Sequence, residues 1–328
     1  MLLSVAFFCL GILILIKGSS FLVDGASSVA AKLKISVFVV GLTVVAFGTS
    51  TPELVVSVTA VLEGSTGIAL GNVVGSNIFN VLIVLGISAI VFPLKIHSNT
   101  VWREIPMSLL AAIILAIFGL QALFDTGDFS GINLAGATRL GEINFSNGLV
   151  LLFFFIIFIY YSFGIAKTVN REAKVKQFSL PKSILFIFLG FIGLVIGGNL
   201  TVENAVFLAR QLGFSENFIG LTLVAAGTSL PELFVSVVAV TKRNSDIAVG
   251  NVIGSNIFNI FFVLGTTSLV RPIPLTGHNL TDILVLFAAT IFLFFSLFVL
   301  KKFHLGRIEG AGMVVFYLFY LAFLVYRG

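Results

Sequence analysis

Apolar residues run along this chain in long blocks that short polar stretches separate. A transmembrane helix needs about 20 apolar residues, and we predict ten such helices from the blocks. They span about 3–28, 37–61, 68–92, 104–123, 148–166, 183–209, 216–240, 247–270, 280–300 and 309–326. The pattern therefore predicts an all-α integral membrane protein.

Two polar motifs interrupt the apolar blocks, and each occurs twice at the same offset. The stretch G-T-S-T-P-E at 48–53 returns as G-T-S-L-P-E at 227–232, which places Glu232 179 residues after Glu53. The same offset carries 71–80 onto 250–259, both of which read G-N-x-x-G-S-N-I-F-N. Two long motifs repeated in register indicate an internal duplication, and any function must use both copies.

The positive charges predict how the helices are oriented. Fourteen of the 19 Lys and Arg residues fall on one predicted side and four on the other. Short cytoplasmic loops carry an excess of Lys and Arg, so the first side is predicted to be cytoplasmic. Both termini are then expected to be extracellular.

Equivalent loops of the two copies differ in their content of positive charge. The loop at 62–67 contains no cation, whereas its counterpart at 241–246 contains Lys242 and Arg243. An odd number of helices per copy reverses the second copy in the membrane, as in the inverted repeats of secondary transporters.

We therefore predict two inverted-topology repeats of five helices each. The first covers 1–166, with its motif region at 41–93, and the second covers 183–328, with its motif region at 220–272. A basic cytoplasmic linker at 167–182 is expected to join them.

The amino-acid composition and the absence of certain motifs argue against several classes of function. The chain is 58% hydrophobic and 10% charged, against about 25% charged residues in soluble domains. No basic stripe with interleaved aromatic residues suggests nucleic acid, and no nucleophile–base pair or metal-binding His motif suggests an enzyme or a bound cofactor. The single cysteine, Cys9, excludes an internal disulfide.

The carboxylates of the first motif are its most informative residues. An ionisable side chain within a membrane is costly and indicates function. The proline before each glutamate cannot donate to the carbonyl four residues back, so carbonyls near 46–48 and 225–227 are expected to leave the helix ladder. On a continuous helix, Thr49 and Ser50 share a face with Glu53. One copy then offers a carboxylate, two hydroxyls and free carbonyls together.

The second motif adds further oxygen ligands. Ser76 and Asn80 are four residues apart on one predicted helix face, as are Ser255 and Asn259. No Cys or His is repeated, which leaves a soft-metal site unsupported. Oxygen donors with two carboxylates suit a hard cation, and Ca²⁺ takes six to eight oxygens from such groups. Na⁺ is expected to use the same oxygens when Ca²⁺ is absent.

Other repeated polar residues have a simpler interpretation. Small polar residues also pack helices together in membranes, and we favour that role for Ser57, Ser236, Asn77 and Asn256. Asp24 and Glu203 also pair by the 179-residue offset, on the first and sixth predicted helices. We expect these two acids to face a cavity or an interface rather than to bind the transported ion.

The two motifs resemble the paired alpha-repeats of the sodium/calcium exchanger family, within the cation/calcium exchanger superfamily. The short basic linker looks like that of prokaryotic members. The resemblance implies a ten-helix fold with cation sites at its centre, and the first and sixth helices sliding across the other eight. The matching metal-ligand positions, with the alanines contributing backbone carbonyls, are Ala46, Thr49, Ser50, Glu53, Ser76, Asn80, Ala225, Thr228, Ser229, Glu232, Ser255 and Asn259.

Three positions refine this resemblance. Some members of the family, including the potassium-dependent exchangers, have Asp where this chain has Asn259, so potassium dependence is not expected. The related proton/calcium exchangers typically carry an acidic residue where this chain has Gly75 and Gly254, which disfavours proton coupling.

We therefore predict a secondary active antiporter in the cell membrane that exchanges Na⁺ for Ca²⁺ by alternating access. A Ca²⁺/H⁺ antiporter is the alternative, and a cation channel is a further rival. The expected partners are Na⁺ and Ca²⁺ as substrates and the lipid bilayer. Neither nucleic acid nor an obligatory protein partner is expected.

Overall fold

The computed structural model describes residues 1–121, 124, 139–166, 177–213 and 225–327. In this part of the chain, eight helices are long and apolar enough to cross a membrane. They are α1 (Leu2–Leu33), α5 (Thr66–Phe79) continued to α6 (Leu85–Val91), η3 (Thr100–Glu104) continued by α7 (Ile105–Gly119), α9 (Phe145–Ala166), α10 (Leu180–Gln211), α14 (Ser245–Ile257) continued to α15 (Gly265–Val270), α16 (Gly277–Val299) and α17 (Arg307–Arg327).

A ninth span is bent in its middle. The helices α2 (Val37–Val40), η1 (Gly41–Val45) and α3 (Ala46–Thr49) run into α4 (Thr51–Leu62) with a bend of 41°. The tenth predicted span, at 216–240, is described only from α12 (Ala225–Gly227) and α13 (Leu230–Thr241) onward. Its first part, 216–224, lies outside the described residues, as do 125–138 and residues 167–176 of the predicted linker.

Several predicted boundaries shift in the structure. The helix predicted at 104–123 begins four residues earlier, at Thr100, and ends at Gly119. The first helix continues past 28 to Leu33, where Lys34 adopts a left-handed conformation with φ 53°. Near its polar end, Ser28 is buried against the start of α10 and accepts hydrogen bonds from the Phe178 backbone N–H at 2.9 Å and the Ser183 hydroxyl at 2.8 Å.

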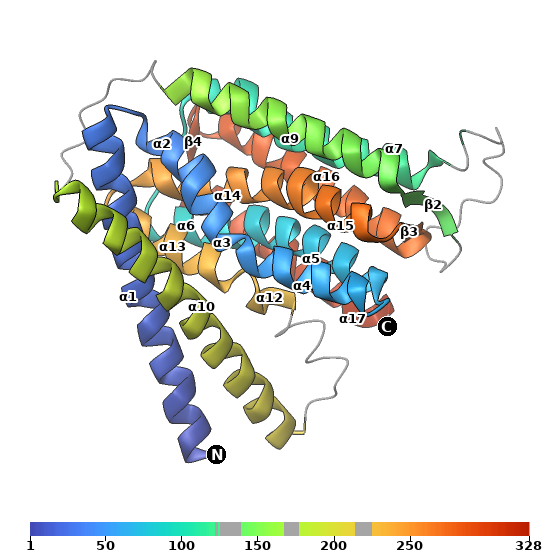
Figure 1. The fold of residues 1–328 in the computed structure, drawn as a ribbon, viewed down its shortest axis with the longest axis horizontal. Helices are drawn as coiled ribbons and strands as arrows, with labels where there is room; N and C mark the ends of the chain where they lie inside the picture. The colour runs from blue at the N-terminus through green and yellow to red at the C-terminus, as the bar shows by residue number, and fades with distance from the viewer. Residues whose placement is uncertain (122–123, 125–138, 167–176, 214–224, 328) are drawn as a thin grey trace.

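The helices α1 and α10 form an antiparallel pair that slants away from the rest of the molecule (Figure 1). Glycines allow the two backbones to approach closely. A Cβ atom on Gly18 would lie 3.0 Å from the Gly190 carbonyl oxygen, and one on Gly197 would lie 2.8 Å from the Leu15 nitrogen. Small residues at a helix interface are typical of membrane proteins, and here they make α1 and α10 a single packed unit.

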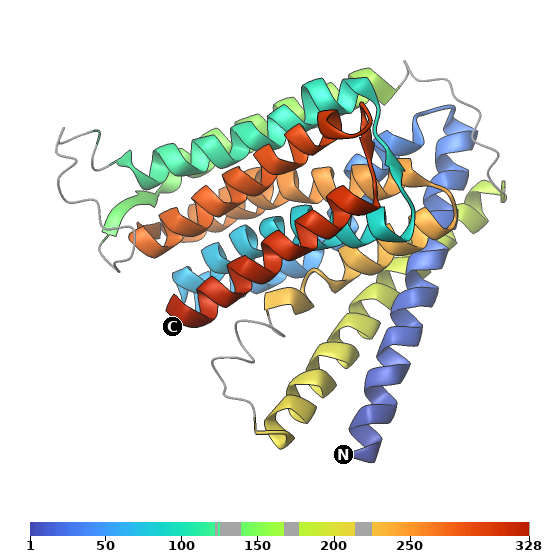
Figure 2. The same ribbon diagram turned by 180° about the vertical axis from the view of Figure 1, so that it is seen from behind.

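The centre of the molecule is formed by the two helices that carry the second motif. Of the residues in the apolar stretch of each span, 83% are buried in Thr66–Val91 and 94% in Ser245–Val270, whereas only 28% are buried in α9 and 17% in α17. From behind, α17 and α16 cover the central helices on one side (Figure 2). The polar motifs therefore lie in the interior of the protein rather than against lipid.

Two short antiparallel strand pairs, which the hydrophobic pattern did not predict, join the ends of the helices. Strand β1 (Leu94–Lys95) pairs with β4 (His304–Leu305), and β2 (Arg139–Ile143) pairs with β3 (Ile273–Thr276). Each strand is too short for its sequence period to distinguish it from a loop. The pairs connect chain segments that are far apart in sequence.

Candidate ion-binding site

Each repeated glutamate lies in the first turn of a helix that begins at a break. Ser50 has φ −82° and ψ 2°, which ends α3, and α4 then begins with Pro52 in its first turn. Ser229 repeats this geometry with φ −90° and ψ 5° before α13. Proline suits the first turn because its missing N–H is not needed there. An acidic residue in the first turn is also favoured by the positive end of the helix dipole.

The carboxylate of Glu53 is fully buried and accepts hydrogen bonds from both halves of the chain. Its Oε1 atom is 3.0 Å from the hydroxyl of Ser76 and 3.3 Å from the hydroxyl of Ser229. These two hydroxyls are also 2.8 Å from each other. One serine belongs to the same copy as Glu53 and the other to the second copy.

Glu232 has the equivalent surroundings with the copies exchanged. Its Oε1 atom is 3.3 Å from the hydroxyl of Ser255 and 3.3 Å from that of Ser50. The prediction that Ser50 shares a helix face with Glu53 is therefore wrong. The helix breaks at Ser50, and the break turns this hydroxyl toward the carboxylate of the other copy.

The threonines of the first motif also reach across to the other copy. Thr49 donates to the side-chain oxygen of Asn251 at 3.0 Å and lies 3.3 Å from the Ser255 hydroxyl. Thr228 donates to the side-chain oxygen of Asn72 at 3.2 Å. The motif of each half is thus completed by residues of the other half.

Asn72 and Asn251 were not among the predicted ligands, yet they support both glutamates. Asn72 donates to the backbone carbonyl of Glu53 at 3.2 Å and to Ser57 at 3.0 Å. Asn251 donates to the carbonyl of Glu232 at 3.4 Å and to the hydroxyl one helical turn further on at 3.2 Å. Their occurrence in both motif copies was the available sequence signal.

Two further asparagines fasten the central helices to each other. The side-chain amide of Asn77 donates to the backbone carbonyl of Asn256 at 3.1 Å, and Asn256 donates back to the carbonyl of Asn77 at 3.3 Å. These contacts match the packing role expected for both residues. Asn259 donates to the side-chain oxygen of Asn77 at 3.0 Å.

Asn80 and Asn259 each lie in a π-helical turn. These turns are η2 (Asn80–Val84) and η5 (Phe258–Leu264). Such turns are rare and often occur at functional sites. Both asparagines are fully buried, so the two turns place two amide side chains in the protein interior.

Several buried oxygens at this centre accept no hydrogen bond within the described structure. They are Oε2 of Glu53 and of Glu232 and the side-chain oxygens of Asn80, Asn256 and Asn259. A buried polar atom without a partner is costly, and carboxylate and amide oxygens are good ligands for a hard cation. Pairs of these atoms are related by the repeat, so the unpartnered oxygens belong to both halves.

The carbonyl of Ala46 does not leave the helix ladder, contrary to the prediction. The carbonyl of Ala46 accepts the backbone N–H of Ser50 at 2.9 Å and the hydroxyl of Thr49 at 3.2 Å, so it remains in the helix ladder. The reason is that Pro52 removes only the donor four residues later than Gly48. Its counterpart Ala225 is the first residue of α12.

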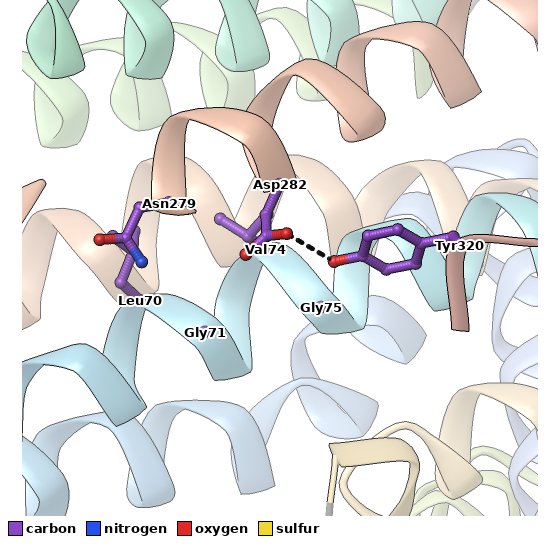
Figure 3. A pocket seen from close by; sticks show the side chains of 7 residues that line it. All are labelled: Leu70, Gly71, Val74, Gly75, Asn279, Asp282 and Tyr320. Carbon is purple, nitrogen blue, oxygen red and sulfur yellow. Dashed lines mark hydrogen bonds between the residues drawn. The ribbon is translucent and has the colours of Figure 1, made fainter. Parts of the chain in front are cut away.

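A separate small cavity lies beside α5 (Figure 3). Its lining includes Gly71, Asn279 and Asp282. The carboxylate of Asp282 accepts a hydrogen bond from Tyr320 at 3.1 Å and two from Arg327 at 2.9 and 3.1 Å. The arginine neutralises this acid, and none of the polar side chains here belongs to the repeated motifs, so we do not count this cavity as part of the ion site.

The chain is similar to known membrane proteins over most of its length. A match to the sodium/calcium exchanger protein family covers residues 3–164 and 182–326. The chain is 35% identical over 346 residues to the sodium/calcium exchanger MaX1 of Methanosarcina acetivorans, with 97% of each chain covered. It is 34% identical over 283 residues to the inner membrane protein YrbG of Escherichia coli, which covers 83% of this chain and 81% of that protein.

The fold also matches a solved structure. The sodium-calcium exchanger NCX_Mj, soaked with Na⁺ and Sr²⁺, superposes with a TM-score of 0.81 at 32% sequence identity, and the match covers 98% of each chain. The protein is thus a multi-pass membrane transporter and not an enzyme. The family match over both halves and the near full-length relatives show that the chain belongs to the sodium/calcium exchanger protein family.

Proposed function

We propose that this protein is a secondary active antiporter that exchanges Na⁺ for Ca²⁺ across the cell membrane by alternating access. Ten transmembrane helices would form two inverted repeats, 1–166 and 183–328, joined by a cytoplasmic linker at 167–182, with both termini outside. The family match divides at nearly the same place, into 3–164 and 182–326. Relatives of similar length are named sodium/calcium exchangers.

The observation that carries the proposal is a set of buried, unpartnered oxygens, one from each glutamate and three from asparagines of the second motif. Two carboxylates supply the charge that neutralises one Ca²⁺, and amide and hydroxyl oxygens complete its shell. The proposed ligands are Ala46, Thr49, Ser50, Glu53, Ser76, Asn80, Ala225, Thr228, Ser229, Glu232, Ser255 and Asn259.

Shared ligands explain why exchange is obligatory. Na⁺ and Ca²⁺ compete for the same oxygens, and an empty site would leave two carboxylates uncompensated in a dry interior. Moving that charged site through the protein is costly, so the transporter returns only when another cation has bound. If several Na⁺ replace one Ca²⁺, net charge moves, and a potential of 100 mV contributes about 2.3 kcal/mol per charge.

Ca²⁺ uptake into proteoliposomes of the purified protein tests the coupling ion. We would compare an outward Na⁺ gradient with an outward H⁺ gradient of equal size, with the membrane potential clamped by a K⁺ ionophore. Uptake driven by the Na⁺ gradient alone is the expected result.

The other outcomes contradict specific parts of the proposal. Uptake driven only by the H⁺ gradient would make the protein a Ca²⁺/H⁺ antiporter with the same site. Uptake that needs neither gradient, together with single-channel currents in planar bilayers, would make it a channel and would exclude alternating access.

A further inference from the structure

One ion pair fastens the α1–α10 pair to the rest of the molecule. The ammonium of Lys242, just after α13, lies 2.7 Å from a carboxylate oxygen of Asp24 in the C-terminal third of α1. It also donates to the hydroxyl of Ser20 at 2.7 Å and to its carbonyl at 3.0 Å. Two residues further on, Asn244 donates to the hydroxyl of Ser27 at 2.8 Å. The loop after α13 thus holds one face of α1 along two helical turns.

The 179-residue repeat assigns each partner in this contact a counterpart. Asp24 corresponds to Glu203 on α10, and Lys242 corresponds to Glu63, just after α4. Glu63 and Glu203 are both exposed here. While α1 packs along α13, α10 makes no comparable contact with α4. The structure is therefore one of two arrangements that the repeat allows.

The two loops are placed alike, although their charges differ. The guanidinium of Arg243 lies 4.6 Å from the ring centre of Phe92. Their counterparts are also neighbours, because a Cβ atom on Gly64 would lie 3.0 Å from the guanidinium of Arg271. If α10 packed on α4 as α1 packs on α13 here, Glu203 would therefore reach the loop that contains Glu63. Arg271 would offset part of the acidic charge there.

We propose that the Asp24–Lys242 ion pair is a latch that biases the transporter toward the arrangement in which α1 is docked on α13. The opposite arrangement, with α10 docked on α4, has no latch, since two carboxylates would face each other where an ion pair stands here. This inference rests on the inverted repeats and alternating access proposed above. It adds that the two end states differ in population because of residues remote from the ion.

The expected effect is modest because the latch is partly exposed to solvent. The side chains of Lys242 and Asp24 are 30% and 31% exposed. An ion pair of this kind shifts an equilibrium by about two- to fivefold. Such a change alters the ratio of the two states without abolishing either.

A distance measurement in the full-length protein tests the latch. In a Cys9→Ser background, we would place spin labels at Leu62→Cys and Phe207→Cys, whose native side chains are 68% and 42% exposed. These sites adjoin Glu63 and Glu203, so their separation shortens when α10 docks on α4. Pulsed electron resonance in nanodiscs then gives the populations of the long and short distances.

Three variants define the expected result. Lys242→Gln should increase the short-distance population about two- to fivefold. Glu63→Lys should increase it too, because it gives Glu203 a partner of opposite charge. The charge exchange Asp24→Lys with Lys242→Asp should restore the original populations. Lys301→Gln, which removes an exposed charge in another loop, should change nothing.

The outcomes separate the latch from the proposed function. Unchanged populations in Lys242→Gln and Glu63→Lys, or an effect as large in Lys301→Gln, would overturn the latch. Na⁺-driven Ca²⁺ uptake by the same samples would then show that antiport stands without it. Conversely, lack of such uptake by the unlabelled wild-type protein would refute the antiport and leave the distances to decide the latch.

Discussion

At the centre of the molecule, the two halves of the chain have interchangeable surroundings. Glu53 and Glu232 each accept one hydrogen bond from a serine of their own half and one from the other half. At the loops after α4 and α13 the halves differ, because Glu63 stands where the second half has Lys242. A cation bound by both halves, as proposed, would need matched ligands, whereas in this structure α1 packs along α13 and α10 does not pack likewise on α4, so the loops after α13 and α4 can differ.

The strongest test of the matched centre removes one charge from it. Glu53→Gln and Glu232→Gln should each reduce Ca²⁺ flux more than about 100-fold, beyond the loss caused by changing a group that only supports a metal ligand. Flux into proteoliposomes measures the effect, with folding checked by size-exclusion chromatography. Glu309→Gln, which alters a carboxylate outside the motifs, should leave the flux unchanged. Full flux in either Gln variant would remove that glutamate from the site.

The asparagine contacts between the central helices are not equal in the two halves, so equivalent substitutions should differ in their effect on stability. Asn77 donates to one partner and accepts from Asn259, whereas Asn256 makes only the reciprocal bond to the carbonyl of Asn77. We expect Asn77→Ala to lower the free energy of unfolding by about 2 kcal/mol and Asn256→Ala by about 1 kcal/mol. Thermal unfolding in detergent compares them. Equal losses would show that the bond from Asn259 contributes nothing.

The crosswise serines test whether the halves truly share their ligands. Ser50→Ala and Ser255→Ala remove the two donors to Glu232, one from each half. Each should weaken apparent Ca²⁺ affinity at least about tenfold, since each variant loses a proposed ligand oxygen as well as a hydrogen bond that orients Glu232. Ser162→Ala loses only a bond within its own helix and should leave the affinity intact. An effect confined to Ser255→Ala would mean that each half builds its site alone.

The glycine contact between α1 and α10 should give the smallest effect. In Gly197→Ala the new methyl would meet the backbone of α1 at 2.8 Å, a steric cost of about 1–3 kcal/mol. The gain of about 1 kcal/mol in helix propensity offsets part of this. Gly312→Ala, where the nearest atom is 3.5 Å away, should keep that gain and stabilise the protein. Thermal unfolding of the two variants in the same detergent measures the difference.

The sequence predicted the interior position of the motifs well. A glutamate behind a proline within an apolar block required burial and partners, and the structure buries Glu53 and Glu232 completely. Helix positions also followed from apolar length, with ends shifted by a few residues, as where α1 continues through polar residues to Leu33. Both features depend on local composition, which a single sequence contains.

Sequence spacing misled where the backbone departs from a regular helix. The three-residue spacing of Ser50 and Glu53 predicts a shared face only on an unbroken helix, and the break at Ser50 invalidates it. Which serine serves which glutamate depends on how the two halves pack, and spacing along one copy contains no information on that. The short strands were not predicted for a similar reason, because the pairing of strands such as β1 and β4 joins segments more than 200 residues apart.

The crosswise hydrogen bonds also have a consequence for how the protein is made. Glu53 and Ser229 are 176 residues apart. Ribosomes add about 5 to 20 residues per second, so this donor is synthesised about 9 to 35 s after the acid it serves. During that interval the first half enters the membrane with an incomplete carboxylate site. The order of synthesis thus separates each carboxylate from half of its hydrogen-bond donors, so the hydrogen bonds of the site are completed only after the second half has been made.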